Sequence, residues 1–394
     1  MSVRPYVAIV ILAAACTADP ASGPAPPSVV LDRNLSTPRY EVEILPVDAH
    51  DNSRGNGINE RGWVAGFLIK PDGDRHAALW RDGRVGDLGT LGGRHSAVIW
   101  PGINASGIIV GISQTSTRDP LDEEWSCEAF IPASINTCVG FAYIRGQMTA
   151  LPTLGGNNGF AADVNDRGDV VGWAETSLRD PTCVAPQVLQ FKAVKWDPIH
   201  NKKDVLRPYP GDSASAATAI NDRGQVVGIS GDCDVAVGRY SARRAVLWER
   251  GRVIDIGNLG GTSWHTPMDI NGEGEVVGFS NPPGDAGGEF IAHAFYWSRK
   301  RGIRDLGLLS GDEISQAFGI NAEGDIVGRS CGASGCRAVI WLDGVLRDLN
   351  GLAAQSPGVL QSAQYINESG VITGRLLETA SGRTLAYVAR PRRR

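Results

Sequence analysis

The chain has 394 residues and a formal net charge of −5 at pH 7, which argues against a role in nucleic-acid binding. It contains 50 Gly and only 3 Met, and no long stretch has the spacing of an amphipathic helix, so we expect an all-β fold with little helix. The basic cluster Arg390–Arg394 lies at the chain end, where a solvated tail (residues 392–394) is the expected form.

The first predicted element is a signal peptide over residues 1–16. MSVR is followed by the apolar run YVAIVILAAA, which is too short to span a bilayer but suits the apolar core of an export signal. The run ends at Cys16 and resembles a bacterial lipobox, with Ala13 where Leu is usual. We therefore expect export, either with a lipid on Cys16 as the sole membrane attachment or with ordinary cleavage nearby. Residues 17–39, rich in Pro, Ala and Ser, are predicted to form a tether.

A repeated phrase, Asn-x-x-Gly-x-φ-φ-Gly with φ loosely apolar, dominates the rest of the chain. Asn favours the first position of a turn because its side chain bonds the backbone ahead of it, and Gly supplies the positive φ that a tight reversal needs. Each phrase therefore predicts a hairpin turn followed by a strand. The phrase begins at Asn59, Asn104, Asn165, Asn221, Asn271, Asn321 and Asn367.

Each repeat contains four short apolar runs, which predict a four-stranded meander with strands A (ending at Asn), B, C and D. Strand C carries an Ala followed three residues later by Trp in five repeats, and we interpret this Trp as core packing between repeats rather than as an aromatic ligand platform. The fourth run, exemplified by GDLGTLGG at Gly86, occurs six times. The isolated strand-like segment Tyr40–Pro46 would supply the missing copy.

The repeat length near 50 residues is typical of propeller blades, although solenoids overlap this range. A linear solenoid would leave Tyr40–Pro46 unpaired, whereas a closed ring pairs it with the last repeat and removes the open sheet edge. The sequence therefore predicts one seven-bladed β-propeller of four-stranded antiparallel blades over residues 40–391, closed by the N-terminal strand.

The phrases INDRG, VVG, DLGTLGG and HAFYW resemble the HAF repeats of exported bacterial proteins, which are named for His-Ala-Phe. His293, Ala294 and Phe295 match in full, while other repeats keep mainly the Ala. The resemblance covers roughly residues 58–388. It implies a repeat architecture but no reaction and no catalytic residues.

Six cysteines remain after Cys16, an even number that suggests disulfides in an exported chain. We predict the pairs Cys127–Cys138, Cys183–Cys233 and Cys331–Cys336. A metal site is the alternative, but the cysteines form no Cys-x-x-Cys pair and have no His nearby. We therefore expect neither a metal nor another cofactor.

The candidate binding residues lie where the repeats differ. The A–B and C–D turns should share one face of the ring, here called the turn face, and the B–C loops and D–A links should share the other, the loop face. The B–C loops vary most in length and hold all six paired cysteines, which suggests a presented surface. Near it we select His95, Asn157, Trp264, His265 and Asp312 from the links, and Trp100 from strand A. Each could equally be structural, and Trp100 could plug the axial channel.

Two classes of function remain. The first is a non-catalytic, envelope-attached or secreted module that binds a protein or a glycan and acts as a monomer. The second is a propeller hydrolase or lyase of polysaccharides, for which Asp163 and Asp269 would be a carboxylate pair. The first is favoured because these two residues lie two repeats apart, and no nucleophile, metal or phosphate-loop motif is present in the sequence.

Overall fold

The computed structural model describes residues 38–123, 125–286 and 288–392. The predicted signal peptide, Cys16, residues 17–37 of the predicted tether and the last two residues of the tail lie outside the described residues. Within the described part, no helix is long and apolar enough to cross a membrane.

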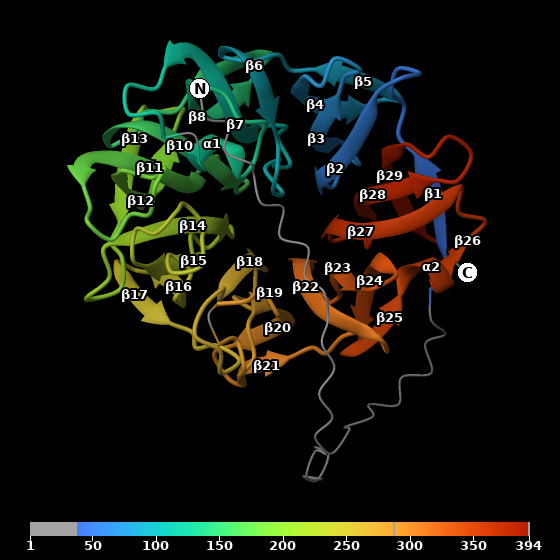
Figure 1. Cartoon of the computed structure of the whole chain (residues 1–394). Helices are drawn as coiled ribbons and strands as arrows, with labels where there is room; N and C mark the ends of the chain where they lie inside the picture. The colour runs from blue at the N-terminus through green and yellow to red at the C-terminus, as the bar shows by residue number, and fades with distance from the viewer. Residues whose placement is uncertain (1–37, 124, 287, 393–394) are drawn as a thin grey trace, which may run out of the picture. The chain divides into compact units, whose positions relative to one another are not determined.

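Residues 38–392 form seven antiparallel sheets arranged in a ring around a central axis (Figure 1), so the predicted seven-bladed propeller is confirmed. Blades 1 to 3 consist of β2 (Asn52–Ile58), β3 (Val64–Ile69), β4 (Arg75–Arg81) and β5 (Arg84–Asp87); β6 (Gly92–Ala97), β7 (Ile109–Arg118), β8 (Asn136–Ile144) and β9 (Gln147–Ala150); and β10 (Gly155–Val164), β11 (Val170–Arg179), β12 (Leu189–Asp197) and β13 (Lys202–Leu206).

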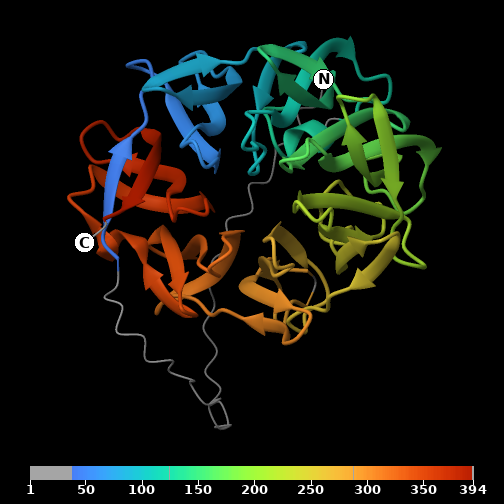
Figure 2. The same cartoon turned by 180° about the vertical axis from the view of Figure 1, so that it is seen from behind.

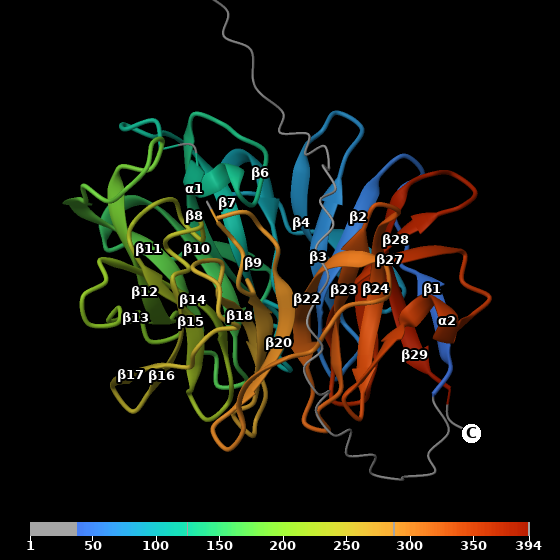
Figure 3. The same ribbon diagram turned by 60° about the horizontal axis from the view of Figure 1, so that its bottom comes forward.

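Blades 4 to 6 follow with the same strand order. They consist of β14 (Ala214–Ile220), β15 (Val226–Gly231), β16 (Arg244–Glu249) and β17 (Arg252–Asp255); β18 (Thr266–Ile270), β19 (Val276–Ser280), β20 (His293–Ser298) and β21 (Gly302–Asp305); and β22 (Asp312–Ile320), β23 (Ile326–Gly332), β24 (Gly335–Leu342) and β25 (Val345–Asp348). Figure 3 shows the ring from another side, with the hairpin β16–β17 at one of its faces.

Blade 7 joins the two ends of the described chain. Its strands are β27 (Gly358–Ile366), β28 (Ile372–Glu378), β29 (Thr384–Pro391) and the N-terminal β1 (Tyr40–Ile44). β1 runs antiparallel to β29, with Tyr40 opposite Pro391 and Ile44 opposite Tyr387, and the two lie side by side in Figure 2. The predicted closure is therefore present.

The structure adds elements that the repeat pattern did not predict. A two-residue strand, β26 (Ala353–Ala354), pairs in parallel with β1 and makes blade 7 five-stranded. Two single-turn helices are present, α1 (Trp125–Glu128) in the B–C loop of blade 2 and α2 (Leu349–Leu352) before β26.

The fourth strands lie earlier in the chain than predicted. In blades 1 and 5 they end at Asp87 and Asp305, so that most of the DLG phrase belongs to the link. The Asp side chain explains the early end, because Asp87 Oδ1 accepts the N–H of Gly89 at 2.8 Å and Asp305 Oδ1 accepts that of Gly307 at 2.7 Å. Such turns remove these N–H groups from the ladder.

Both glycines of the repeated phrase have structural reasons. The first has φ between +75° and +86° in all seven turns, as predicted for a tight reversal. The second lies opposite a β-bulge in strand A, where a Cβ on Gly66 would stand 1.9 Å from the carbonyl oxygen of Arg54. The sequence alone did not predict this bulge.

The repeated Trp residues form the core between blades, as predicted. Trp80, Trp196 and Trp341 are almost fully buried. Trp80 Nε1 donates to the carbonyl of Pro46 at 2.7 Å, and Trp196 Nε1 to that of Pro152 at 3.0 Å, in each case on the segment that leads into the blade from its neighbour. These residues therefore join blades and offer no ligand platform.

Candidate functional site at the axis of the ring

The Asn of each turn joins neighbouring blades on the turn face. In Asn221, Oδ1 accepts the N–H groups of Arg223 and Gln225, as predicted, and Nδ2 also donates to the carbonyl of Asn271 in the next blade at 2.9 Å. Among the described residues, six of the seven Asn side chains make this interblade bond, and that of Asn367 to Asn59 closes the circle. Each Asn is therefore both a turn former and a connector.

A cavity of about 210 Å³ opens at the axis inside this circle of turns. It contains the carboxyl groups of Asp163 and Asp269, and burial raises their pKa to about 6 and about 8, with the Asp163 charge contributing at Asp269. Each carboxylate accepts two backbone N–H groups. One is from the neighbouring blade, Ile220 for Asp163 and Ile320 for Asp269. The two residues therefore tie blades together.

Trp100 fills the channel above this cavity. It makes edge-to-face contacts with Phe160 at 4.9 Å and with Phe130 at 5.6 Å between ring centroids. It also packs against Met268 and Phe318, which belong to blades 5 and 6. A side chain from blade 2 that reaches blades 5 and 6 must cross the axis. The plug anticipated for Trp100 is thus the arrangement found.

Four arginines surround the loop-face side of the plug, and we call them the cationic mouth: Arg54, Arg75, Arg329 and Arg375. Three come from inner strands of consecutive blades at one level, since Arg329 is opposite Gln316, Arg375 is opposite Ser362, and Arg54 is at the same position on β2. The fourth, Arg75, lies 4.7 Å from the ring centroid of Phe67, the cross-strand partner of Arg54. The channel therefore has arginines at one end and carboxylates at the other.

The mouth has no acidic partner. Among the described residues, no Asp or Glu forms an ion pair with any of its four arginines, and the Nε atoms of Arg54, Arg75 and Arg375 are buried without a hydrogen bond. Burial lowers the pKa of Arg54 to about 9, with the neighbouring arginines adding to the effect, and lowers that of Arg329 to about 10. All four side chains remain partly exposed and cationic at neutral pH.

Aromatic side chains form the rest of the mouth. Phe130 stacks on Phe160 at 4.5 Å between ring centroids, and its carbonyl oxygen accepts a bond from Arg75 Nη1 at 2.7 Å. Within blade 6, Arg329 lies 5.6 Å from the ring centroid of Phe318. The mouth thus combines cationic and aromatic side chains, and Arg75 and Arg329 each lie over a phenylalanine ring.

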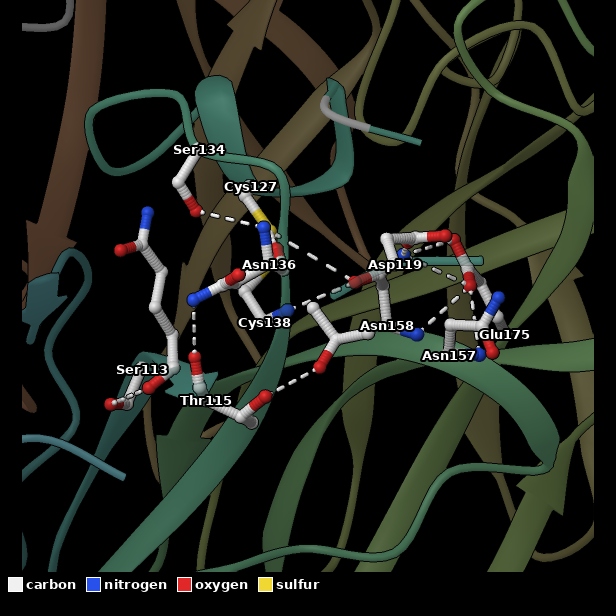
Figure 4. The surroundings of a disulfide bond; sticks show 12 residues. Ser113, Thr115, Asp119, Cys127, Ser134, Asn136, Cys138, Asn157, Asn158 and Glu175 are labelled. Carbon is white, nitrogen blue, oxygen red and sulfur yellow. Dashed lines mark hydrogen bonds between the residues drawn. A yellow bond between two sulfur atoms is a disulfide. The ribbon is translucent and has the colours of Figure 1, made fainter. Parts of the chain in front are cut away.

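The long B–C loop of blade 2 brings Phe130 to this position, and Figure 4 shows how it is held. The loop is closed by the Cys127–Cys138 disulfide, and Asn158 Oδ1 accepts the N–H of Cys138 at 2.9 Å. Asn158 Nδ2 in turn donates to Asp119 Oδ2 at 2.7 Å. The loop is therefore a fixed part of the mouth.

The other two predicted disulfides are also formed, Cys183–Cys233 between the loops of blades 3 and 4, and Cys331–Cys336 within blade 6. Three disulfides indicate an oxidising, extracytoplasmic environment. Among the described residues, no group of three or more His, Cys, Asp or Glu side chains has a metal-binding arrangement.

Trp264 and His265 lie directly before β18. The Trp264 ring packs against Phe290 at 5.4 Å, and its Nε1 donates to the carbonyl of Gly288. The His265 side chain is only 1% exposed and its Nδ1 lies 2.8 Å from Ser280 Oγ. Burial lowers the pKa of His265 to about 4, so the ring is neutral at pH 7.

The remaining candidates lie in other blades. His95 is buried and its Nδ1 accepts the N–H of Arg75 at 3.1 Å, while Asn157 donates its backbone N–H to Glu175 at 3.1 Å. Asp312 pairs with Arg337 at 3.0 Å. Among the described residues, no hydrogen bond or ring contact joins any two of the six candidates. They share the loop face but do not form one site, and only Trp100 lies at the axis.

Sequence reasoning missed the arginines of the mouth, although alignment of the repeats carries a signal for two of them. Eight residues after the repeated Asn stands Phe67, Ile112, Trp173, Ile229 or Phe279 in blades 1 to 5, but Arg329 and Arg375 stand there in blades 6 and 7. Two cations at a position that is otherwise apolar depart from the pattern more sharply than a single unusual His.

No protein-family model matches the chain, and no curated protein matches it. Among solved structures it is similar to the oligogalacturonate lyase of Vibrio parahaemolyticus, with 11% identity and a TM-score of 0.52, over 89% of this chain and 93% of that one. The acylaminoacyl peptidase of Pyrococcus horikoshii has 12% identity and a TM-score of 0.50, over 87% of this chain. The match spans about half (52%) of the peptidase. At these identities the similarity establishes the propeller fold alone.

Proposed function

We propose that this chain is an exported, non-catalytic binding propeller that holds a glycan ligand in the mouth on its loop face. The observation that carries the proposal is the cationic mouth, in which four partly exposed arginines surround a plugged axis without an acidic partner among the described residues. Guanidinium groups that converge without an acidic partner suit the recognition of an anionic ligand.

The chemistry of the mouth supports binding rather than catalysis. Guanidinium groups stay protonated at neutral pH, so they can orient an anion but are poor proton-transfer groups. The carboxylates of Asp163 and Asp269 lie on the other side of the Trp100 plug, and each is engaged by two backbone N–H groups.

The finer parts of the proposal concern the origin and attachment of the chain. The three disulfides support export. An N-terminal signal peptide, a lipid on Cys16, a monomeric state and kinship with the HAF-repeat proteins are part of the proposal and rest on the sequence patterns described above.

A binding screen with simultaneous detection of turnover tests the function. The chain from residue 17 onward would be incubated with an array of polysaccharides and with envelope proteins, and both bound and degraded material would be measured. We expect retention of a glycan without new reducing ends or unsaturated products, and equal retention by Arg223→Ala, a turn-face variant. Degradation of any polysaccharide would favour a hydrolase or lyase instead, and retention of proteins alone would contradict a glycan ligand.

A further inference from the structure

We propose that the ligand of the mouth is a polyuronate, a sugar chain with a carboxylate on each ring, recognised by Arg54, Arg329 and Arg375. This inference rests on the proposed function and names its ligand class. Arg75 is set apart because its Nη1 already donates to the carbonyl of Phe130. Arg329 also has a neutral partner, since its Nε donates to Gln316 Oε1 at 2.7 Å, so it would bind an anion through its Nη groups.

The three arginines converge because the ring closes. They lie on β2, β23 and β28, in blades 1, 6 and 7. Blades 6 and 7 are consecutive in the chain, and closure of the ring brings blade 1 beside blade 7. All three lie at the same height in their blades. Arg54 stands five residues before the repeated Asn of strand A, and Arg329 and Arg375 are paired with the residues at that position in their own blades. This height is just on the loop-face side of the strand A bulge. Arg54 is sensitive to the charges of both Arg329 and Arg375, so the three groups are close in space.

Two other arginines of the loop face show how this fold pairs a partly buried guanidinium group with an acid of its own chain. Arg244 and Arg337 are as partly buried on the loop face, yet each pairs with an Asp at the head of a strand A, Asp212 at 3.3 Å and Asp312 at 3.0 Å. Uncompensated, partly buried cations repel one another and are unfavourable for folding. Three arginines at one place, none of them in an ion pair with a described residue, therefore point to an anion that is not part of the chain.

The form of the mouth favours a carboxylated sugar. A guanidinium group presents a planar fork of donors that matches a carboxylate in two parallel hydrogen bonds. Beside the arginines, the partly exposed Trp100 ring supplies rigid apolar surface for the carbon face of a sugar ring, and the buried Phe130 and Phe318 rings pack behind it. A phosphate or sulfate ester shares the charge but not the planar geometry, and the experiment below separates these cases.

Charge also restricts the ligand to one face. The opposite end of the channel is lined by Asp163 and by four acids of the turns, namely Glu60, Asp166, Asp222 and Glu368, while burial keeps Asp269 protonated at pH 7. A polyanion is repelled there and attracted at the arginine end. The two ends of the channel thus differ in the sign of the charge on the ligand that they can hold.

The first test compares four polymers on the chain from residue 17 onward: polygalacturonate, its fully methyl-esterified form, dextran sulfate and unmodified dextran. We expect binding of polygalacturonate that weakens with added salt, and at least tenfold weaker binding of the other three. Arg54→Gln, Arg329→Gln and Arg375→Gln should each weaken polygalacturonate binding by roughly ten- to hundredfold, as loss of a hydrogen bond between charged groups does. Arg223→Gln, which removes the same charge on the turn face, should bind as the wild type does.

The outcomes separate the inference from the function on which it rests. Binding of a neutral glycan at wild-type strength by all three arginine variants would overturn the polyuronate inference and leave the binding function intact. Equal binding of dextran sulfate and polygalacturonate would identify a general anion site and also overturn it. Failure of polygalacturonate and of every other glycan to bind would overturn both.

A second measurement needs no ligand and distinguishes a recognition role from a structural one. Arg54→Gln should leave the thermal midpoint in low salt unchanged or raise it, because it removes a cation that only other cations surround. Arg337→Gln, which breaks the pair with Asp312, should lower the midpoint. If Arg54→Gln lowers the midpoint as much as Arg337→Gln does, Arg54 is a structural residue and the inference is wrong.

Discussion

At the scale of single residues, the repeated Asn does more than form a turn. Asn221 makes four side-chain hydrogen bonds, to Arg223, Gln225 (backbone and side chain) and Asn271. Asn321 is an exception. Its side chain makes one hydrogen bond to a backbone group, which is the bond that Oδ1 accepts from the N–H of Asp325. Asn221 therefore has more hydrogen-bond partners than Asn321, although both stand at the same position of the repeated turn.

This difference predicts unequal costs of substitution. A buried hydrogen bond contributes about 1 kcal/mol, so Asn221→Ala should lower the free energy of unfolding by about 3 kcal/mol and Asn321→Ala by about 1 kcal/mol. Urea unfolding of the two variants measures this, with the exposed Gln147→Ala as a control of negligible effect. Equal losses at the two Asn positions would show that the interblade bond contributes nothing.

The buried carboxyl of Asp269 predicts a pH dependence of stability. An Asp in the unfolded chain titrates near 4, whereas burial raises the pKa of Asp269 in the folded chain to about 8. Between these values the folded chain holds a proton that the unfolded chain has lost, so the free energy of unfolding contributed by Asp269 falls as pH rises from about 4 to about 8. Asp269→Asn removes the titrating group.

Urea unfolding at pH 5 and pH 9 gives the loss of unfolding free energy between the two pH values, which is compared between the wild type and Asp269→Asn. The wild type should lose roughly 2–5 kcal/mol more than Asp269→Asn over this interval. Identical pH dependence in the two proteins would mean that Asp269 is ionised throughout the range.

At the scale of elements, β1 is the strand that closes the ring. It pairs with β29 along its whole length and with β26 on its other edge. Tyr40 is 2% exposed and packs in the core of blades 6 and 7. One strand therefore completes the last blade and covers its neighbour.

Removal of β1 should open the ring. A chain that begins at Val47 should unfold at a midpoint at least 10 °C below that of a chain that begins at Pro38, because it exposes a sheet edge and the Tyr40 site. Thermal unfolding followed by circular dichroism compares the two. A shift of only a few degrees would show that seven blades hold together without the closing strand.

The disulfides differ in the length of chain that they enclose. Cys183 and Cys233 are 50 residues apart, whereas Cys331 and Cys336 are 5 apart. On the chain-entropy account, loss of the first should cost about 4 kcal/mol and loss of the second about 2 kcal/mol. Unfolding of the two Cys→Ala double variants checks this order, and a larger loss from the short disulfide would contradict it.

The repeated strands and turns were easier to predict from sequence than the roles of residues that depart from the repeat. The seven Asn phrases, the repeated Trp and the solitary Tyr40–Pro46 each imply local geometry, and together they predicted a closed seven-bladed ring. The cationic mouth was not found, because Arg54 is distant in sequence from Arg329 and Arg375 and comes near them in space only when the ring closes. His265 was selected as an exception to the repeat, yet its burial depends on packing that the repeat pattern does not contain.

At the scale of the whole molecule, the propeller is a ring with unlike faces. The turn face is held by repeated Asn and acidic side chains, and the loop face carries disulfide-bonded loops and the arginines. The Trp100 plug separates the two ends of the channel. The account's central claim is that the loop-face mouth, and not the turn face, receives the ligand.

Hydrogen exchange with and without polygalacturonate tests this claim most directly, because it locates the ligand on the folded chain. We expect protection of backbone amides in β2, β23 and β28 around Arg54, Arg329 and Arg375, and in the loop that carries Phe130, with no change in the seven Asn-x-x-Gly turns. Protection confined to those turns or to the outer strands of the blades would contradict the account.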